Sequence, residues 1–152
     1  MGRTTFSGPV TATRGFEMAP AVLADADATL TESANGNRIN LVPNGTQDNT
    51  YTLPAPTAGA MYTFVYAGGA ADATDFLITS GADANFFIGG VTFDATGDGA
   101  ASVVYSDGNS NSTLQVNVPA AAEICVLGLD ATNWQVFGRV TGATAPAFAD
   151  QA

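Results

Sequence analysis

The side chains with which this chain could do chemistry are almost all carboxylates. Its 152 residues include no histidine, no lysine, one cysteine and four arginines, against fourteen aspartates and glutamates. Without histidine or lysine, the Ser-His-Asp, Cys-His and Schiff-base arrangements cannot be built, and zinc would lack its preferred ligands. Acid–base work would therefore fall to Asp, Glu or Tyr.

Hydrolysis of a glycosidic bond by two carboxylates is the enzyme class that this composition leaves open. Such an enzyme needs a carboxylic acid whose pKa is raised by an apolar or aromatic pocket. No aspartate or glutamate of this chain lies within an aromatic cluster of the sequence. We therefore expect the chain not to be an enzyme, and we expect no cofactor.

One acidic loop resembles the start of a calcium-binding loop. Asp107, Asn109 and Asn111 match the first three ligand positions of an EF-hand. The match then fails, because Ser112 stands where glycine is needed and Val118 stands where a bidentate glutamate is needed. We interpret this segment as a polar loop tip.

Two further acidic pairs, Asp25 with Asp27 and Asp94 with Asp98, have the residue types of a weak calcium site. Neither pair is joined by enough oxygen ligands at a fixed spacing to predict one. We expect no metal site at either turn.

The large aromatic residues offer a different chemistry, since Trp and Tyr rings stack against sugars as well as filling cores. The candidates for such a platform are Trp134, Tyr51, Tyr62, Tyr66 and Tyr105. Each of them falls within a strand pattern, so we interpret them as core residues.

The elements that must position these side chains are β-strands, because no window of the sequence has sustained helical periodicity. Short runs rich in β-branched and aromatic residues alternate with clusters of Gly, Asn, Asp and Ser. The predicted strands are 28–31, 38–42, 51–53, 61–66, 76–79, 86–88, 91–93, 101–105, 113–118, 123–129 and 134–140. Their spacing predicts an all-β fold, which could be a β-sandwich, a jelly roll or a barrel. Of these we expect an antiparallel, jelly-roll-like β-sandwich.

Two details of this prediction concern individual segments. Residues 123–129 are apolar at both alternating positions, which predicts a central strand covered on each side; Cys125 within it is expected to be a small buried core residue. Asp107-Gly108 lies between the strands 101–105 and 113–118, so we predict a hairpin loop there.

Charge divides the chain into two parts. Residues 1–16 contain Arg3 and Arg14 and no acid, whereas the remainder holds all fourteen acids and two arginines. We predict an extended N-terminal docking arm over residues 1–24 and a β-sandwich body over residues 25–152. The net charge of −10 argues against nucleic acid as a partner, and no apolar run reaches the 18 residues of a membrane span.

The arm is too irregular to form its own core, yet it carries apolar side chains at intervals. We expect these to pack into grooves of a partner protein while the two arginines reach acidic or carbonyl groups there. The predicted interface residues are Arg3, Phe6, Pro9, Val10, Arg14 and Phe16.

Several stretches resemble the small capsid-decorating, or cement, proteins of tailed bacteriophages, notably of the type found in phages of marine bacteria and cyanobacteria. These stretches are TLTESANGNRINLV, YTLPAPTAGAMYTFVYA, ANFFIGGVTF, YSDGNSNSTLQV and NWQVFGRV, with GRTTFSGPV at the start and PAFAD near the end. The segment TLPAPTAG is the most distinctive of them.

The resemblance implies a β-rich, jelly-roll-like structural protein without catalytic residues. It implies a homo-oligomer, most often a trimer, that binds the major capsid protein on the outer surface of the virion after synthesis in the host cytoplasm. A second reading stays open: a tail or fibre module that recognises a host surface glycan, which a shallow aromatic groove on the outer surface would favour.

Overall fold

The computed structural model describes residues 18–69, 73–97, 99 and 101–151. About 50% of the described residues are in strands and 3% are in a helix, so the prediction of a nearly all-β fold is confirmed. The elements are β1 (Ala21–Val22), β2 (Ala28–Thr29), α1 (Glu32–Asn35), β3 (Arg38–Val42), β4 (Asn49–Thr52), β5 (Met61–Tyr66), β6 (Phe76–Thr79), β7 (Phe86–Ala95), β8 (Ala101–Tyr105), β9 (Thr113–Val116), β10 (Pro119–Gly128), β11 (Asn133–Gly142) and β12 (Ala147–Ala149).

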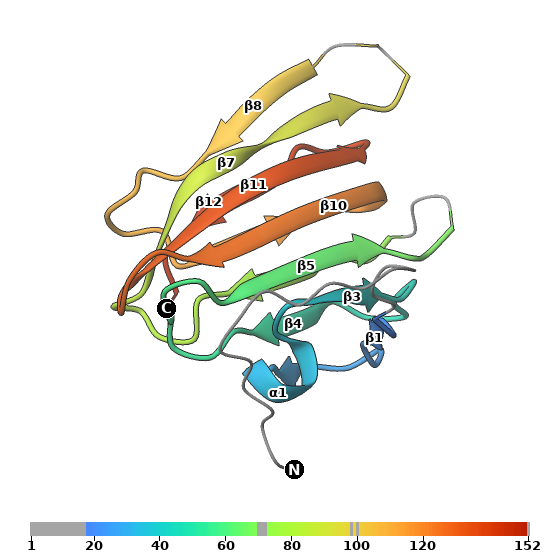
Figure 1. Cartoon of the computed structure of the whole chain (residues 1–152). Coiled ribbons are helices and arrows are strands. Elements are labelled where there is room, and N and C mark those ends of the chain that lie inside the picture. The colour runs from blue at the N-terminus through green and yellow to red at the C-terminus, as the bar shows by residue number, and fades with distance from the viewer. Residues whose placement is uncertain (1–17, 70–72, 98, 100, 152) are drawn as a thin grey trace, which may run out of the picture.

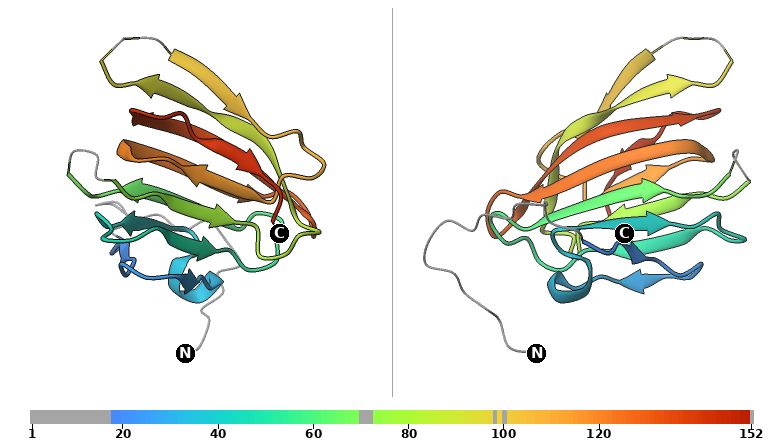
Figure 2. Two further views of the ribbon diagram at one scale, coloured as in Figure 1. Left: turned by 180° about the vertical axis from the view of Figure 1, so that it is seen from behind. Right: turned by 45° about the vertical axis from the view of Figure 1, so that its right-hand side comes forward.

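The strands form two sheets that face each other (Figures 1 and 2). One sheet has seven strands in the order β1-β3-β5-β10-β11-β7-β8, and the other has five in the order β12-β9-β6-β4-β2. The hairpin of β7 and β8 projects at one end of the larger sheet (Figure 1). The arrangement is sandwich-like, with one wide layer and one narrow layer.

The sheets are mixed rather than purely antiparallel, and the order of the first six strands explains why. Strands β1, β3 and β5 lie in the larger sheet, while β2, β4 and β6 lie in the smaller one. A chain that crosses between two layers after every strand returns to each layer running in the same direction. The neighbours β1–β3, β3–β5, β2–β4 and β4–β6 are accordingly parallel.

The second half of the chain closes both layers with antiparallel pairs. Strand β10 lies between β5 and β11 and is antiparallel to both, and β9 is antiparallel to β6 and β12. Strand β7 pairs in parallel with β11 and turns back as β8. Residues 86–95 thus form one strand where the sequence predicted two. Gly89 and Gly90 interrupt the apolar pattern of the sequence, but the backbone hydrogen bonding with the neighbouring strands continues through them.

The core lies between the two sheets and is filled by alternate residues of both. Trp134 and Tyr62 are fully buried and meet edge to face, with ring centroids 5.7 Å apart. The other fully buried large side chains are Tyr51, Phe64, Phe87, Leu30, Leu53, Ile78, Leu114, Ile124, Val42 and Val91. Burial of this apolar surface is the main stabilising contribution to the fold.

Strand β3 shows how tertiary contacts choose the inward face. Its apolar residues Ile39 and Leu41 face outward, and Ile39 is 47% exposed. Asn40 is fully buried instead, because its side-chain amide bonds the carbonyl and the side chain of Asn35 at the end of α1. These hydrogen bonds offset the cost of burying a polar side chain.

Two local predictions are wrong. Strands β8 and β9 belong to different sheets, so Asp107-Gly108 lies in a crossover and not in a hairpin. Strand β10 is central in its sheet, but only its inner face is covered by described residues: Ile124 and Val126 are buried, whereas Cys125 is half-buried on the outer face. Cys125 is therefore not a core residue.

The described chain begins at Met18, within the segment expected to be the arm. Ala21 and Val22 pair with β3, and Leu23 is buried in the core, so residues 21–23 belong to the larger sheet. Within the described part of the chain, no helix has the length and apolar character needed to cross a membrane.

Candidate docking surface

Several acidic side chains considered as metal ligands are held by hydrogen bonds, and Asp98 lies outside the described residues. The carboxylate of Asp107 accepts the backbone N–H groups of Asn109, Ser110 and Asn111 and the hydroxyl of Ser110. These bonds, led by that of the Ser110 hydroxyl, hold the pKa of Asp107 well below its usual range. The loop is an Asx-type turn in which the carboxylate replaces missing backbone partners.

Asp25 and Asp27 act in the same way between distant segments. The Asp25 carboxylate accepts from the Asn49 side-chain amide at 2.7 Å and from the backbone N–H of Thr46 at 2.9 Å, which lowers its pKa. Asp27 accepts from the N–H of Thr50 at 2.7 Å. Among the described residues, no group of three or more Asp, Glu and Cys side chains has the arrangement of a metal site.

The aromatic residues divide between core and surface. Trp134, Tyr51 and Tyr62 are buried, as predicted, and therefore cannot form a sugar platform. Tyr66 is half-buried, and its hydroxyl donates to the Asn44 side chain at 3.0 Å. Tyr105 is 73% exposed, so its assignment to the core is wrong.

The outer face of the seven-stranded sheet is the feature that stands out from the rest of the molecule. Register places one cross-strand row along it: Ile39 beside Thr63, then Cys125, Phe137, Gly90 and Tyr105. The next row holds Leu41, Val65, Glu123, Arg139, Thr92 and Val103. We call the side chains of these two rows, together with Met61, the outer face.

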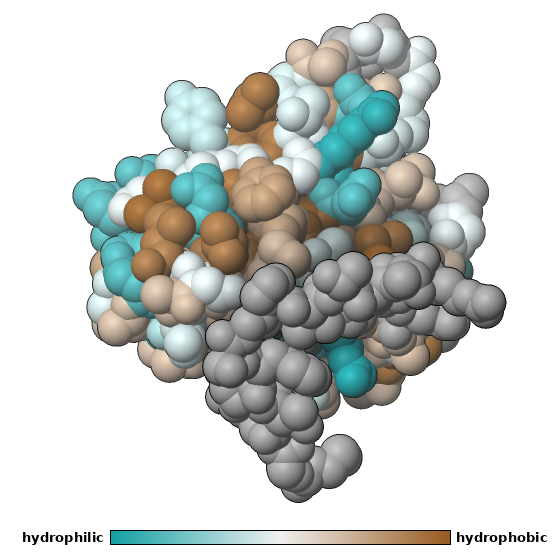
Figure 3. Space-filling model, in the orientation of Figure 1, coloured by the Kyte–Doolittle hydropathy of each residue, from teal (hydrophilic) through white to brown (hydrophobic). Residues whose placement is uncertain are grey.

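Apolar side chains dominate this outer face although it is open to solvent. Phe137 is 49% exposed, Ile39 is 47%, Met61 is 38% and Val103 is 64%. In the view of Figure 3, apolar and polar groups alternate across the molecule. The central row of the opposite sheet's outer side instead holds Thr50, Leu77, Gln115 and Ala147. Contiguous exposed apolar surface of this kind marks interaction sites.

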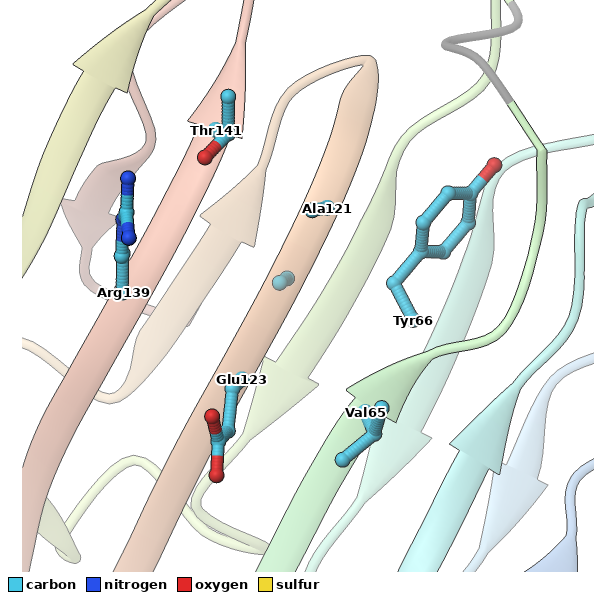
Figure 4. Close-up of a pocket in the computed structure, with 7 residues that line it drawn as sticks. Val65, Tyr66, Ala121, Glu123, Arg139 and Thr141 are labelled. Carbon is cyan, nitrogen blue, oxygen red and sulfur yellow. The ribbon is translucent and has the colours of Figure 1, made fainter.

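Two charged residues lie in the middle of the outer face. Glu123 and Arg139 are cross-strand neighbours on β10 and β11. They extend in opposite directions along the sheet (Figure 4), and Arg139 forms an ion pair with Asp94 of β7. Open depressions lie on either side of this pair: one is lined by Val65, Tyr66, Ala121, Ala122 and Thr141, the other by Met61, Thr63, Cys125, Phe137 and Gly138.

Gly138 shapes the second depression. Its φ of +154° lies in a region that side-chain-bearing residues rarely adopt, and a Cβ there would lie 2.2 Å from the carbonyl oxygen of Glu123. The missing side chain allows the backbones of β11 and β10 to approach each other closely at this point. The result is a shallow, mainly apolar surface and not an enclosed ligand cavity.

The residues predicted as the interface, Arg3, Phe6, Pro9, Val10, Arg14 and Phe16, lie outside the described residues. The outer face was missed by the sequence prediction, although a signal for it exists. The strand 123–129, with apolar residues at both alternating positions, was interpreted as covered on both sides. The same pattern also fits a strand whose second apolar face awaits a partner.

Comparisons with known proteins identify no relative: no family model matches the chain, and no curated protein or solved structure matches it significantly.

Proposed function

We propose that this chain is a structural virion protein that binds the outer surface of a phage capsid and stabilises the shell. The observation that carries the proposal is the apolar, solvent-open outer face of the seven-stranded sheet. A flat face of this type suits a flat protein partner, because a small ligand requires a concave site. The sequence resemblance to cement proteins adds the identity of that partner, the major capsid protein, and a jelly-roll-like character for the fold.

The place where the described chain begins supports the same partner. The described chain begins next to β1, which forms one edge of the seven-stranded sheet. Met18 and Val22 at this edge are 63% and 76% exposed. Residues 1–17 precede this point in the sequence, and they include Phe6 and Phe16 as apolar residues and Arg3 and Arg14 as basic ones. Arm and face can engage one shell together, which raises the effective concentration of the second contact.

The chemistry of the carboxylates supports a non-enzymatic role as part of this proposal. Asp107 accepts hydrogen bonds within its own turn, Asp25 accepts hydrogen bonds from a distant segment, and Asp94 is paired with Arg139. Glu123 remains exposed in the middle of the outer face, where its carboxylate is placed to accept a basic group of the partner. Self-association into a homo-oligomer, with a trimer as the form implied by the resemblance, belongs to the same proposal.

The test is decoration of purified capsids of the phage that encodes the chain. A variant lacking residues 1–16 and a Phe137→Glu variant should both lose occupancy; Phe137 alone should account for about a tenfold loss, since burial of a half-exposed aromatic contributes about 1–2 kcal/mol. The matched control is Ala147→Glu, which places the same charge on the opposite sheet. Unchanged occupancy in both the truncated and the Phe137→Glu proteins would refute the proposal.

A second measurement tests stabilisation itself. A protein that binds only the assembled shell raises its melting temperature by mass action. Decorated capsids should therefore melt above undecorated ones at both low and moderate salt, because apolar contacts resist screening whereas repulsion between acidic bodies weakens. Equal melting temperatures would refute the cement function.

A tail or fibre module that binds a host glycan is the second candidate. One observation favours it: Phe137 and Tyr105 are exposed in the same row, separated only by Gly90. Sugar stacking on these rings would make glycan binding sensitive to Phe137→Ala and Tyr105→Ala. Binding of the protein to host cells without capsids, lost in these variants, would favour this candidate over capsid decoration.

A further inference from the structure

Among the residues that the structure describes, no strand or charged side chain protects the sheet edge formed by β8. It forms one end of the seven-stranded sheet, and in Figures 1 and 2 no other strand lies beyond it. Its sequence, Ala-Ser-Val-Val-Tyr, contains no charge and no proline. Val103 and Tyr105 are 64% and 73% exposed. Proteins normally protect such edges from pairing with another chain, because a row of unpaired N–H and C=O groups is a template for another strand.

The other three edges are protected by the usual means. Strand β1 has two residues and follows Pro20, and β2 has two residues and follows Asp27. Strand β12 has three residues, enclosed by Pro146 and Asp150. Within the described residues, β8 is thus the one edge strand of five residues, and it is the one without a charge or proline at its ends or within it.

The hydrogen-bond pattern identifies which groups of β8 are free. Ser106 donates its N–H to the Gly89 carbonyl at 2.9 Å. In an antiparallel pair of strands, every second residue directs its backbone N–H and C=O groups toward the same neighbouring strand. Val104 and Ser102 therefore form backbone hydrogen bonds with β7, as Ser106 does. Val103 and Tyr105, together with Ala101, direct their N–H and C=O groups away from β7. Their side chains belong to the outer face.

We propose that β8 pairs with β8 of a second copy of this chain, antiparallel, about a two-fold axis at Val103. Val103 then lies opposite Val103 of the second copy, and Ala101 lies opposite Tyr105 in both directions. Each of these pairs exchanges two N–H···O bonds. The strand is uncharged, so self-pairing brings no like charges directly opposite each other even though each chain carries −10. The isologous contact closes on itself and does not propagate into a filament.

The pair has a consequence for the outer face. An antiparallel partner in the same sheet turns its side chains to the same side, so the two outer faces become one continuous surface. The two β1 edges lie at its opposite ends. This inference does not depend on capsid binding: it concerns the free protein, and its failure would leave the decoration assay above unaffected.

The first measurement is the mass of the full chain by sedimentation as concentration rises to ~1 mM, a range that captures weak pairing. We expect a shift from 15.3 kDa to twice that mass. A monomer throughout this range would overturn the proposal, and a trimer would overturn it in favour of the form that the sequence resemblance implies.

Two variants test the edge itself. Val103→Lys places like charges opposite each other across the axis and should raise the dissociation constant at least tenfold. Val103→Pro removes only an N–H that points away from β7, so it should abolish pairing while leaving the β7–β8 ladder intact. The matched control is Val22→Lys, which adds the same charge at an exposed position of the opposite edge and should still dimerise.

Amide hydrogen exchange locates the contact. In dilute protein the N–H groups of Val103 and Tyr105 should exchange rapidly, while that of Val104, bonded to β7, is protected. At dimerising concentrations the first two should become protected as well. A dimer that leaves them unprotected, or that Val103→Lys does not weaken, would place the interface elsewhere and overturn the proposal.

Discussion

Two buried tyrosines of the core differ in whether the hydroxyl group has a hydrogen-bond partner. This difference predicts that replacement by phenylalanine affects stability differently at the two positions. Tyr51 and Tyr62 are both fully buried. The Tyr51 hydroxyl donates to the carbonyl of Ala24 at 3.1 Å. The Tyr62 hydroxyl has no hydrogen-bond partner among the described residues. Replacement by phenylalanine deletes only the hydroxyl in each case.

The expected magnitudes follow from these contacts. Tyr51→Phe loses a hydrogen bond whose net contribution is about 0.5–1.5 kcal/mol, and because Ala24 is exposed its carbonyl can be hydrated instead. Tyr62→Phe removes an unsatisfied buried group that itself costs about 1–3 kcal/mol. We therefore expect Tyr51→Phe to lower the free energy of unfolding by about 1 kcal/mol and Tyr62→Phe to leave it unchanged or raise it.

The assay is denaturant unfolding of the monomeric protein followed by circular dichroism and Trp134 fluorescence. A difference of about 1–2 kcal/mol between the variants should appear in thermal melts as roughly 2–8 °C. Tyr66→Phe serves as the control, because its hydrogen bond to Asn44 is exposed and should contribute little. If Tyr62→Phe destabilises the fold as much as Tyr51→Phe, the Tyr62 hydroxyl has a partner and the reasoning fails.

Other predictions rest on backbone geometry and on titration. Gly138→Ala should destabilise the fold by roughly 1–3 kcal/mol more than Gly59→Ala. Both glycines have positive φ, but only at Gly138 would the new Cβ meet the facing backbone. Equal losses of unfolding free energy in chemical denaturation would refute the close-approach argument. Hydrogen bonds, first that of the Asn133 side chain, lower the pKa of Asp130 from 3.8 to about 2. The contribution of the Asp130 carboxylate to the stability of the fold should therefore be complete above pH 4 and be lost as the pH falls toward 2. Asp130→Asn should flatten this part of the pH–stability profile. Burial raises the pKa of Tyr51 from 10 to about 12, so stability should fall as pH rises from 10 to 12, and a profile that is as steep in Tyr51→Phe would contradict this assignment.

The sequence determined much of the secondary structure. Segments 38–42, 61–66, 76–79 and 101–105 are strands with the predicted bounds, because β-branched and aromatic residues between Gly, Asn and Asp clusters have few other stable conformations. The residues that fill the core, such as Trp134, were also predictable from alternation. Local chemistry was sufficient in each of these cases.

The tertiary structure decided which sheet each strand joins and which face is buried. Alternation separates the two sides of a strand, but the side that turns inward depends on the contacts available, as Asn40 shows by displacing Ile39 from the core. Parallel pairing arises from the repeated crossing between layers, which no local pattern encodes. The candidate site could not be predicted from the sequence, because it depends on how the strands are arranged. Val103, Arg139 and Cys125 come from three separate strands, β8, β11 and β10, and only sheet order and register bring them onto one surface.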